Sequence, residues 1–262
     1  MSGHSHAKTV AATKNANDAK KGKIFSKWGR VITMAAKENG GDIATNAKLK
    51  TVIEQAKRFN MPKENIERSI KKGAGELAGE SLEEVSFEGF GPGGVAIIME
   101  GITDNKNRTL GEVKGILGQY EGKMAGEGAI RWMFERKGVI LVEKKDLPAQ
   151  AGDLESLAIE AGADDIRENA IYTKPEDLET VKKTLEISGL NIESAALQWV
   201  PKEEIEVSEK EKTRAHALFE ALDENDAIQE IYSNMKVWRF SALIPERQRR
   251  GTRLLKLKLP NT

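Results

Sequence analysis

Residues 85–102, VSFEGFGPGGVAIIMEGI, place two strand-like runs on either side of a glycine-rich turn. The turn, residues 89–94, formally matches the dinucleotide-binding pattern G-x-G-x-x-G. That pattern requires a helix after the last glycine, whereas here residues 95–99 are strand-like and Pro92 lies in the turn. We therefore expect an antiparallel β-hairpin and no nucleotide cofactor.

Downstream of the hairpin, strand-like runs alternate with amphipathic helical segments. The predicted strands cover residues 85–90, 95–102, 129–134, 139–142, 165–168, 170–172, 192–200, 204–207 and 228–232, and the predicted helices cover residues 108–120, 153–161, 177–187 and 209–222. This arrangement is typical of α+β layers, in which helices pack on antiparallel sheets. The first α+β unit has no closing helix until Glu209, so the middle unit fits an insertion within it.

Upstream of the hairpin the chain is predicted to be a small helical domain. Apolar residues at 3.6-residue spacing indicate helices over residues 20–37, 46–59 and 61–72. We expect Pro62 in the first turn of the third helix and Gly73 as its C-cap. Four cations of the first helix lie on a stripe beside its apolar one: Lys23, Lys27, Arg30 and Lys37.

Charge is strongly segregated along a chain whose formal net charge is zero. Residues 1–75 hold 16 Lys/Arg and 6 Asp/Glu, residues 76–235 hold 17 and 34, and residues 236–262 hold 8 and 1. The chain thus has a basic head, an acidic body and a basic tail. A local positive field attracts polyanions whatever the total charge, so we expect the head to bind a phosphate backbone.

The candidate nucleic-acid-binding residues are the cations of the head: Lys8, Lys14, Lys20, Lys21, Lys23, Lys27, Arg30, Lys57, Arg58, Lys63, Arg68, Lys71 and Lys72. Each phosphate that such a side chain neutralises releases counterions, which makes binding salt-dependent. Phe25, Trp28 and Phe59 fit the helical core, so base stacking is not predicted for the head. No helix-turn-helix with base-reading side chains is evident. The competing interpretation is that the lysines only keep a surface helix soluble.

Two further basic stretches are candidates with simpler explanations. Lys106 and Arg108 lie in a polar loop that could contact phosphate, although an N-cap role for Asp104 or Asn105 already explains the loop. The arginine-rich tail, residues 238–262, is either a solvated terminus or a nonspecific nucleic-acid contact.

Other functional classes find little support in the sequence. The chain has no cysteine and three histidines, and no nucleophile–base or metal-ligand spacing is present. We predict that the protein is not an enzyme and binds no metal, cofactor or small-molecule substrate. No apolar run approaches the roughly 20 residues of a spanning helix, so we expect a cytoplasmic protein without a membrane partner.

Several separated motifs occur in a fixed order over about residues 1–235. They are GHS at 3–5, NDAKKGKIFSK at 17–27, NMPKENIER at 60–68, IKKG at 70–73, EGFGPGG at 88–94, TDNKNRT at 103–109, and WMF at 132–134 followed by KG at 137–138. In this order they closely resemble the YebC family. Its members are described as probable transcriptional regulatory proteins, and the mitochondrial member is a translational activator of cytochrome c oxidase. Two departures are His6-Ala7, where the family commonly has Lys-Trp, and the tail beyond residue 236.

The resemblance implies an α+β fold in which a helical N-terminal domain precedes two α+β domains, the third inserted in the second. We place the boundaries at residues 1–75 for the basic helical domain, 76–135 with 204–236 for domain II, 136–203 for the inserted domain III, and 237–262 for the basic tail. It also implies nucleic-acid binding through the first domain, to promoter DNA or to ribosomal RNA.

The main hypothesis is therefore a non-enzymatic, nucleic-acid-binding regulator of gene expression, which resembles the YebC-family probable transcriptional regulators that bind DNA. The first alternative is a ribosome-associated translation factor of the same family, which binds ribosomal RNA and relieves stalling. The second alternative is a protein-interaction module whose acidic body binds a basic partner. The sequence leaves open which nucleic acid is bound, the sequence preference, the oligomeric state and the role of the tail.

Overall fold

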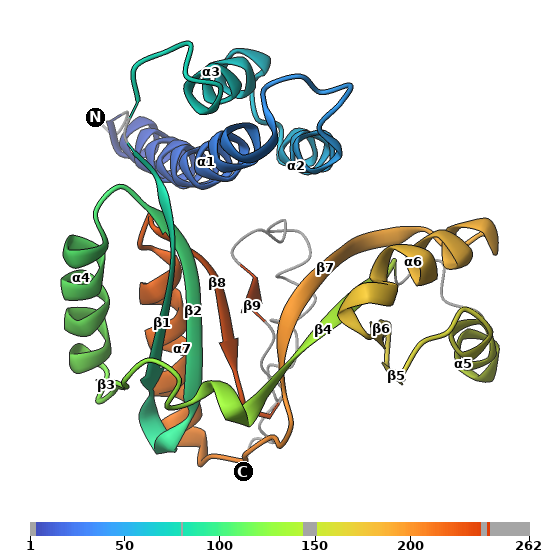
Figure 1. The fold of residues 1–262 in the computed structure, drawn as a ribbon. Helices are drawn as coiled ribbons and strands as arrows, with labels where there is room; N and C mark the ends of the chain where they lie inside the picture. Colours follow the sequence, from blue (N-terminus) through green and yellow to red (C-terminus); the bar gives the residue numbers. More distant parts are fainter. Residues whose placement is uncertain (1–3, 80, 144–150, 237–239, 242–262) are drawn as a thin grey trace.

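A computed structural model describes the backbone of residues 4–79, 81–143, 151–236 and 240–241, and the side chains of residues 21–79, 81–143 and 153–236. A helical head lies across one end of a five-stranded sheet, and a four-stranded sheet with its own helices extends to one side (Figure 1). The predicted α+β fold is confirmed. The predicted tail falls almost wholly outside the described residues.

The head consists of α1 (His4–Asn39), α2 (Ala47–Arg58) and α3 (Lys63–Gly73). Both short helices pack against α1 and bury one apolar face there. The largest contributors are Trp28 and Ile32 from α1 and Leu49 from α2, all almost fully buried. All members of this apolar cluster belong to the head, so the head has a hydrophobic core of its own.

Two details at α3 differ from the prediction. Gly73 lies inside the helix, where a Cβ would stand only 2.3 Å from the Thr33 carbonyl oxygen, so the missing side chain lets α3 approach α1 closely. The C-cap is Ala74, and the left-handed position that follows is taken by Gly75 (φ 79°). Pro62 is the N-cap residue and precedes the first turn. The first helix is also longer than predicted, since it begins at His4.

The larger sheet has the strand order β3-β1-β2-β8-β9. Its centre is the predicted hairpin of β1 (Glu83–Phe90) and β2 (Ala96–Thr103), which pair antiparallel around the short η1 turn (Pro92–Gly94). The other strands are β3 (Lys123–Met124), β8 (Ile228–Ser233) and β9 (Phe240–Ser241). One face is covered by α4 (Lys106–Gln119) and α7 (Glu209–Asp223), as Figure 1 shows.

The smaller sheet has the order β5-β6-β4-β7 and lies between β3 and α7 in sequence. Its strands are β4 (Phe134–Val142), β5 (Asp165–Arg167), β6 (Ala170–Thr173) and β7 (Ile192–Pro201). Helices α5 (Ala151–Glu160) and α6 (Leu178–Ile187), the latter preceded by the short η4 turn (Pro175–Asp177), cover one of its faces. The chain thus leaves the larger sheet, builds the smaller one and returns, as the inserted topology requires.

Two predicted strands do not form. Residues 129–134 were expected to be extended, but they form the η2 turn (Arg131–Met133) and only Phe134 joins β4. The reason is that Glu88 accepts the backbone N–H groups of Gly128 and Ile130, which are therefore not available to a neighbouring strand. Residues 204–207 make a single parallel bridge, between Ile205 and Met235.

Candidate nucleic-acid interface

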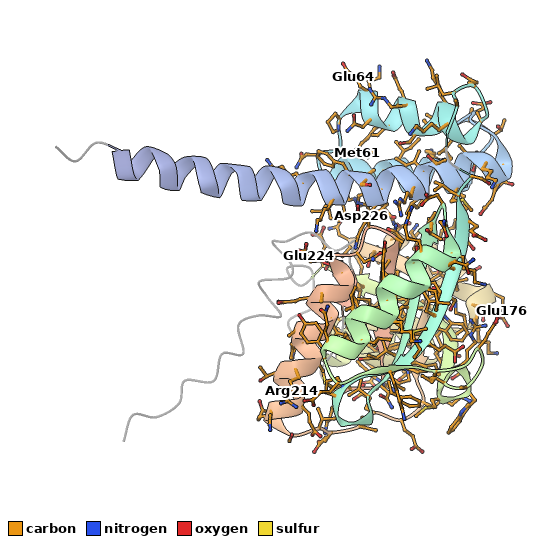
Figure 2. The ribbon with its side chains drawn as sticks, turned by 90° about the vertical axis from the view of Figure 1, so that its left-hand side faces the viewer. Met61, Glu64, Glu176, Arg214, Glu224 and Asp226 are labelled. Carbon is orange, nitrogen blue, oxygen red and sulfur yellow. The ribbon has the colours of Figure 1, made fainter. Side chains whose placement is uncertain are left out.

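One side of α1 contacts the acidic body, and Lys27 on this side is withdrawn from solvent. The side chain of Lys27 is only 4% exposed, and its Nζ lies 3.0 Å from Asp223 Oδ1 and 2.6 Å from the Asp223 carbonyl oxygen. Lys23 pairs with the Glu224 carboxylate in the same way, one turn earlier on α1 and closer to solvent. Figure 2 shows Glu224 and Asp226 beneath α1, at the end of the body on which the head rests.

The same side of α1 makes two more contacts. Arg30 Nη1 donates to the Ile102 carbonyl oxygen at 2.9 Å, and Lys37 Nζ donates to that of Leu82 at 2.9 Å. Arg30 is also close enough to Asp104 to help lower the pKa of that carboxyl, although the hydrogen bond from Arg108 is the larger cause. We name Lys23, Lys27, Arg30 and Lys37 the docking cations.

The sequence predicts that the basic stripe of α1 is an exposed face that binds a polyanion. In the structure, the docking cations of this stripe bind groups of the body instead. The physical reason lies at the end of α7. The last carbonyl groups of a helix have no partner within the helix and form its negative dipole end, and α7 has no basic residue of its own in its last turn. Asp223 and Glu224 add two carboxylates to this negative end. Acidic residues at a helix C-terminus are unfavourable without a partner, and this is the sequence signal that could have predicted the docking.

A second group of head cations lies on α2 and α3. We name it the outer basic surface: Lys50, Lys57, Arg68, Lys71 and Lys72. All five are exposed, and within the described part of the chain none of them forms a salt bridge. Lys50 and Lys57 are two turns apart on α2, and Lys71 and Lys72 both lie one turn after Arg68 on α3, so each set shares a helix face. Glu64 and Glu67 lie toward the start of α3, which concentrates its positive charge at its C-terminal half.

The remaining predicted residues are placed less favourably. Lys63 pairs with Glu67 at 3.4 Å, and Arg58 Nη1 donates to the Glu193 carbonyl oxygen of β7 at 2.9 Å. Lys21 is exposed. Arg108 is held by Asp104 at 2.5 Å, while Lys106 beside it is exposed. The side chains of Lys8, Lys14 and Lys20 lie outside the described residues.

Asn105 is the N-cap of α4, since its side chain accepts the backbone N–H of Arg108 at 3.0 Å. The predicted capping role of this loop is therefore confirmed. A contact of Lys106 or Arg108 with phosphate stays a prediction.

A polar network, which the sequence analysis missed, joins the two sheets. Glu100 Oε1 accepts the Trp199 Nε1 proton at 2.7 Å and faces Arg136 Nη1 at 3.3 Å. The Arg136 and Arg131 guanidinium groups lie 5.1 and 5.5 Å from the centre of the Trp199 ring, as in cation–π pairs. Burial, together with nearby carboxylates, raises the pKa of the Tyr232 hydroxyl next to this network. Only the approach of β4 and β7 to β2 reveals it, because its members are far apart in sequence.

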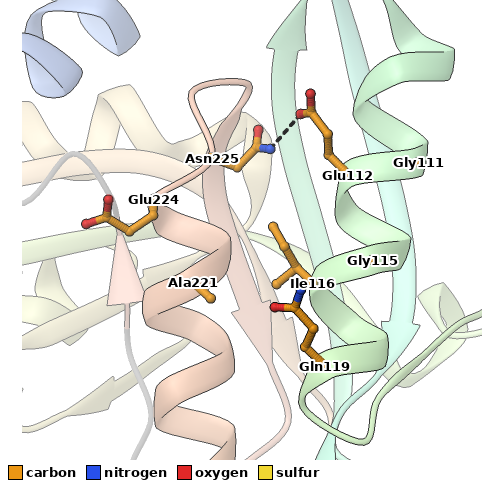
Figure 3. A pocket seen from close by; sticks show the side chains of 8 residues that line it. All are labelled: Gly111, Glu112, Gly115, Ile116, Gln119, Ala221, Glu224 and Asn225. Carbon is orange, nitrogen blue, oxygen red and sulfur yellow. Dashed lines mark hydrogen bonds between the residues drawn. The ribbon is translucent and has the colours of Figure 1, made fainter.

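An open groove of about 390 Å³ lies between α4 and α7 (Figure 3). Gly111 and Gly115 form one wall, and Asn225 donates a hydrogen bond across it to Glu112 at 2.8 Å. The groove has no nucleophile next to a base. Among the described residues, no three His, Asp or Glu side chains are grouped as metal ligands would be.

Burial lowers the pKa of His216 on α7.

Comparison with known proteins places the chain in a family. The family model for the TACO1/YebC N-terminal domain matches residues 5–76, and the model for the TACO1/YebC second and third domains matches residues 82–235. The chain belongs to the TACO1/YebC family. A probable transcriptional regulatory protein of Thermoanaerobacter pseudethanolicus is 44% identical over 90% of this chain and 98% of its own length. One from Thermotoga maritima is also 44% identical, over 90% and 94%.

A solved structure supports the same placement. The crystal structure of a conserved hypothetical protein from Aquifex aeolicus matches with a TM-score of 0.76 and 43% identity, over 84% of this chain and 91% of that one. In this TACO1/YebC protein, the outer basic surface and the docking cations all lie within the part matched by the N-terminal family model. None of the described helices has the length and apolar character needed to cross a bilayer.

Proposed function

We propose that this protein is a non-enzymatic, cytoplasmic regulator of gene expression that binds a nucleic-acid backbone through the outer basic surface. The observation that carries the proposal is the division of the head cations into two groups. One group is used by contacts with the body, whereas the other is exposed and forms no salt bridge among the described residues. Lysine and arginine side chains free of carboxylates are the groups that release counterions when they neutralise phosphates.

Contact with the backbone, and not with base edges, agrees with the side chains that α2 and α3 present. Their exposed positions carry mainly Lys, Arg and Glu, while Gln55 and Asn65 are partly buried. Asn46, another residue type that reads bases, is buried and fully used. It caps α2 by accepting the Leu49 N–H at 2.9 Å and donates to the carbonyl oxygens of Ala35 and Gly40. We therefore expect strong salt dependence and weak sequence preference from the head.

The acidic body limits where a polyanion can lie. Its excess of carboxylates repels phosphate, so the field favours approach from the side of α2 and α3. This is why a protein with zero formal net charge can still bind nucleic acid at one end.

The test compares two double variants with the same change in charge. Lys71→Ala with Lys72→Ala removes two cations of the outer basic surface, and Lys183→Ala with Lys210→Ala removes two exposed lysines of the body. Fluorescence anisotropy with labelled DNA and RNA duplexes, over a series of salt concentrations, gives the affinity and its salt slope. The first variant should bind more weakly and lose about one unit of slope per phosphate contact, while the second should match the wild type. Equal behaviour of the two variants would refute the proposal.

The relatives are named probable transcriptional regulatory proteins, and backbone binding also fits ribosomal RNA. Promoter-fragment binding and co-sedimentation with ribosomes, at the same salt concentration, separate these two targets. Sequence-independent DNA binding together with co-sedimentation would support the translational role. A promoter preference without co-sedimentation would support transcription.

A further inference from the structure

Strand β7 is the longest edge strand of the two sheets. It has ten residues and ends the order β5-β6-β4-β7, whereas the other edge strands, β3, β5 and β9, have two or three. Its single charged residue is Glu193, and it has no lysine. An exposed edge is usually protected by shortness, charge or a bulge, because its free backbone groups attract another strand. The bulge of β7 lies near its start, so the rest of its edge is open to strand pairing.

The register of β7 shows which backbone groups are free. Lys202 continues the ladder with β4 and donates its N–H to the Met133 carbonyl oxygen at 3.0 Å. Bonded and non-bonded pairs alternate in an antiparallel ladder, so the even-numbered residues of β7 bond to β4. The N–H and C=O groups of Ala195 and Leu197 therefore point to the opposite side. Within the described part of the chain, no backbone hydrogen bond involves these outward groups.

Two contacts close this free edge at its ends. Arg58 of α2 donates to the Glu193 carbonyl oxygen at 2.9 Å, and Trp199 donates to Glu100 of β2 at 2.7 Å. The open length between these contacts is short, with the head at one end and the larger sheet at the other. A single extended segment fits such a place better than the edge of a second folded copy, which would bring its own head and larger sheet with it.

The free edge is apolar, and its surroundings carry negative charge. Ala196 and Leu197 are exposed, the latter by 40%. Residues 151–203, which contain three of the four strands of this sheet, hold 5 Lys/Arg and 12 Asp/Glu. An extended segment that alternates apolar and basic side chains therefore complements the edge.

The chain contains such a segment in its basic tail. Leucine and lysine alternate in residues 254–259, LLKLKL, which lie outside the described residues. The chain comes close to β7 before it enters the tail, since Ser241 of β9 pairs with β8, and Tyr232 of β8 shares an apolar cluster with Trp199 of β7. The 12 residues that follow, 242–253, can span up to about 40 Å, which is enough to reach the free edge.

We propose that residues 254–259 pair with the free edge of β7 as a fifth strand of the smaller sheet. The outward N–H and C=O groups of Ala195 and Leu197 then gain partners, as in other cases of strand addition. Because side chains alternate between the faces of a sheet, the leucines at every second position can lie beside Leu197 while the lysines lie on the other face. The added strand ties the two sheets together through β9. The family model ends at residue 235, so this contact belongs to the tail of this chain.

Hydrogen exchange at single amides tests the pairing in the full-length protein. Leu257→Pro removes a backbone donor from the middle of the segment, and Thr252→Pro is the matched control in the same tail, before the segment. In the wild type, the amides of Ala195 and Leu197 should be protected. In Leu257→Pro they should exchange about tenfold faster, as the loss of one hydrogen bond implies, while Thr252→Pro should match the wild type.

A disulfide crosslink shows which chain supplies the strand. The sequence has no cysteine, so an introduced pair has no competitor. Ala196→Cys is combined in turn with Lys256→Cys and with Lys258→Cys, and Thr252→Cys replaces the lysine variants as the control. Oxidation of at least one lysine combination should give a monomer with an internal disulfide, whereas the control should stay reduced.

Three results would overturn the proposal. Fast exchange of Ala195 and Leu197 in the wild type would mean that the edge is open. Protection that survives Leu257→Pro and rises with protein concentration would assign the edge to a second copy. A disulfide formed only between two chains would place the tail on a neighbouring molecule. Neither measurement contains nucleic acid, so its failure leaves the proposed function untouched.

Discussion

Replacing Lys27 by alanine should release the head from the body, because Lys27 is the most buried of the docking cations. Its Nζ makes two contacts, at 3.0 and 2.6 Å, with the carboxylate and carbonyl oxygens of Asp223. Removing one partner of such a buried pair costs about 3–5 kcal/mol, since the other charge stays desolvated without compensation. The head has a core of its own, so it can undock and rehydrate Asp223. The loss is therefore limited to the free energy of docking.

The contrast with Lys23 makes the prediction quantitative. The side chains of Lys23 and Glu224 are 43% and 59% exposed, and exposed pairs contribute at most about 1 kcal/mol. Denaturant unfolding of Lys27→Ala, Asp223→Ala and the double variant forms one thermodynamic cycle, and the corresponding changes at Lys23 and Glu224 form a second. We expect a coupling energy above about 1.5 kcal/mol in the first cycle and below about 1 kcal/mol in the second.

Hydrogen exchange provides an independent measurement. In Lys27→Ala, faster exchange should appear at the end of α7 and at the start of β1, which the docked head covers, while the core of the smaller sheet stays protected. Lys27→Met, which keeps most of the buried stem, isolates the charge from the packing. Equal coupling energies in the two cycles, or wild-type exchange in Lys27→Ala, would refute the view that a buried ion pair holds the head.

Three other changes test the packing and the titration. Gly73→Ala should destabilise the head by about 1–3 kcal/mol in denaturant unfolding, because its Cβ would meet the Thr33 carbonyl oxygen, whereas Gly115→Ala in the open part of α4 should stabilise by about 0.5–1 kcal/mol. Asn46→Ala should cost about 1–3 kcal/mol, seen as a lower midpoint, since it removes the cap of α2 and leaves buried carbonyl groups without donors. Because burial lowers the pKa of His216, the unfolded chain binds its proton more readily, so stability should fall as pH decreases below about 6.5, and His216→Gln should reduce that slope.

Local patterns were sufficient to predict the central hairpin and the helices of the head. The hairpin around residues 89–94 follows from a proline and strand-like flanks, and the helices of the head follow from their apolar spacing. The role of Gly73 was predicted wrongly because a glycine after Lys71 and Lys72 has the same local pattern as a C-cap. Only the path of α1 across α3 shows that the glycine is needed for close packing.

The site was harder to predict, because the use of each cation depends on what lies opposite it. The residues next to Lys27 and Lys71 in sequence do not show what lies opposite each side chain, yet Lys27 is buried against α7 and Lys71 is exposed. The partner of Lys27 lies 196 residues away. Glu88 likewise organises a loop 40 residues downstream, which no periodicity in β1 reveals.

Segregation of charge serves two physical purposes in this chain. At short range, the carboxylates at the end of α7 bind the docking cations and orient the head, a contact in which water is largely excluded around Lys27. At longer range, under the proposed function, the same acidic body would repel phosphate and direct a polyanion to the outer basic surface. Added salt should weaken the second effect much more than the first, because screening acts mainly on exposed charges. The head should therefore remain docked at salt concentrations that already abolish nucleic-acid binding.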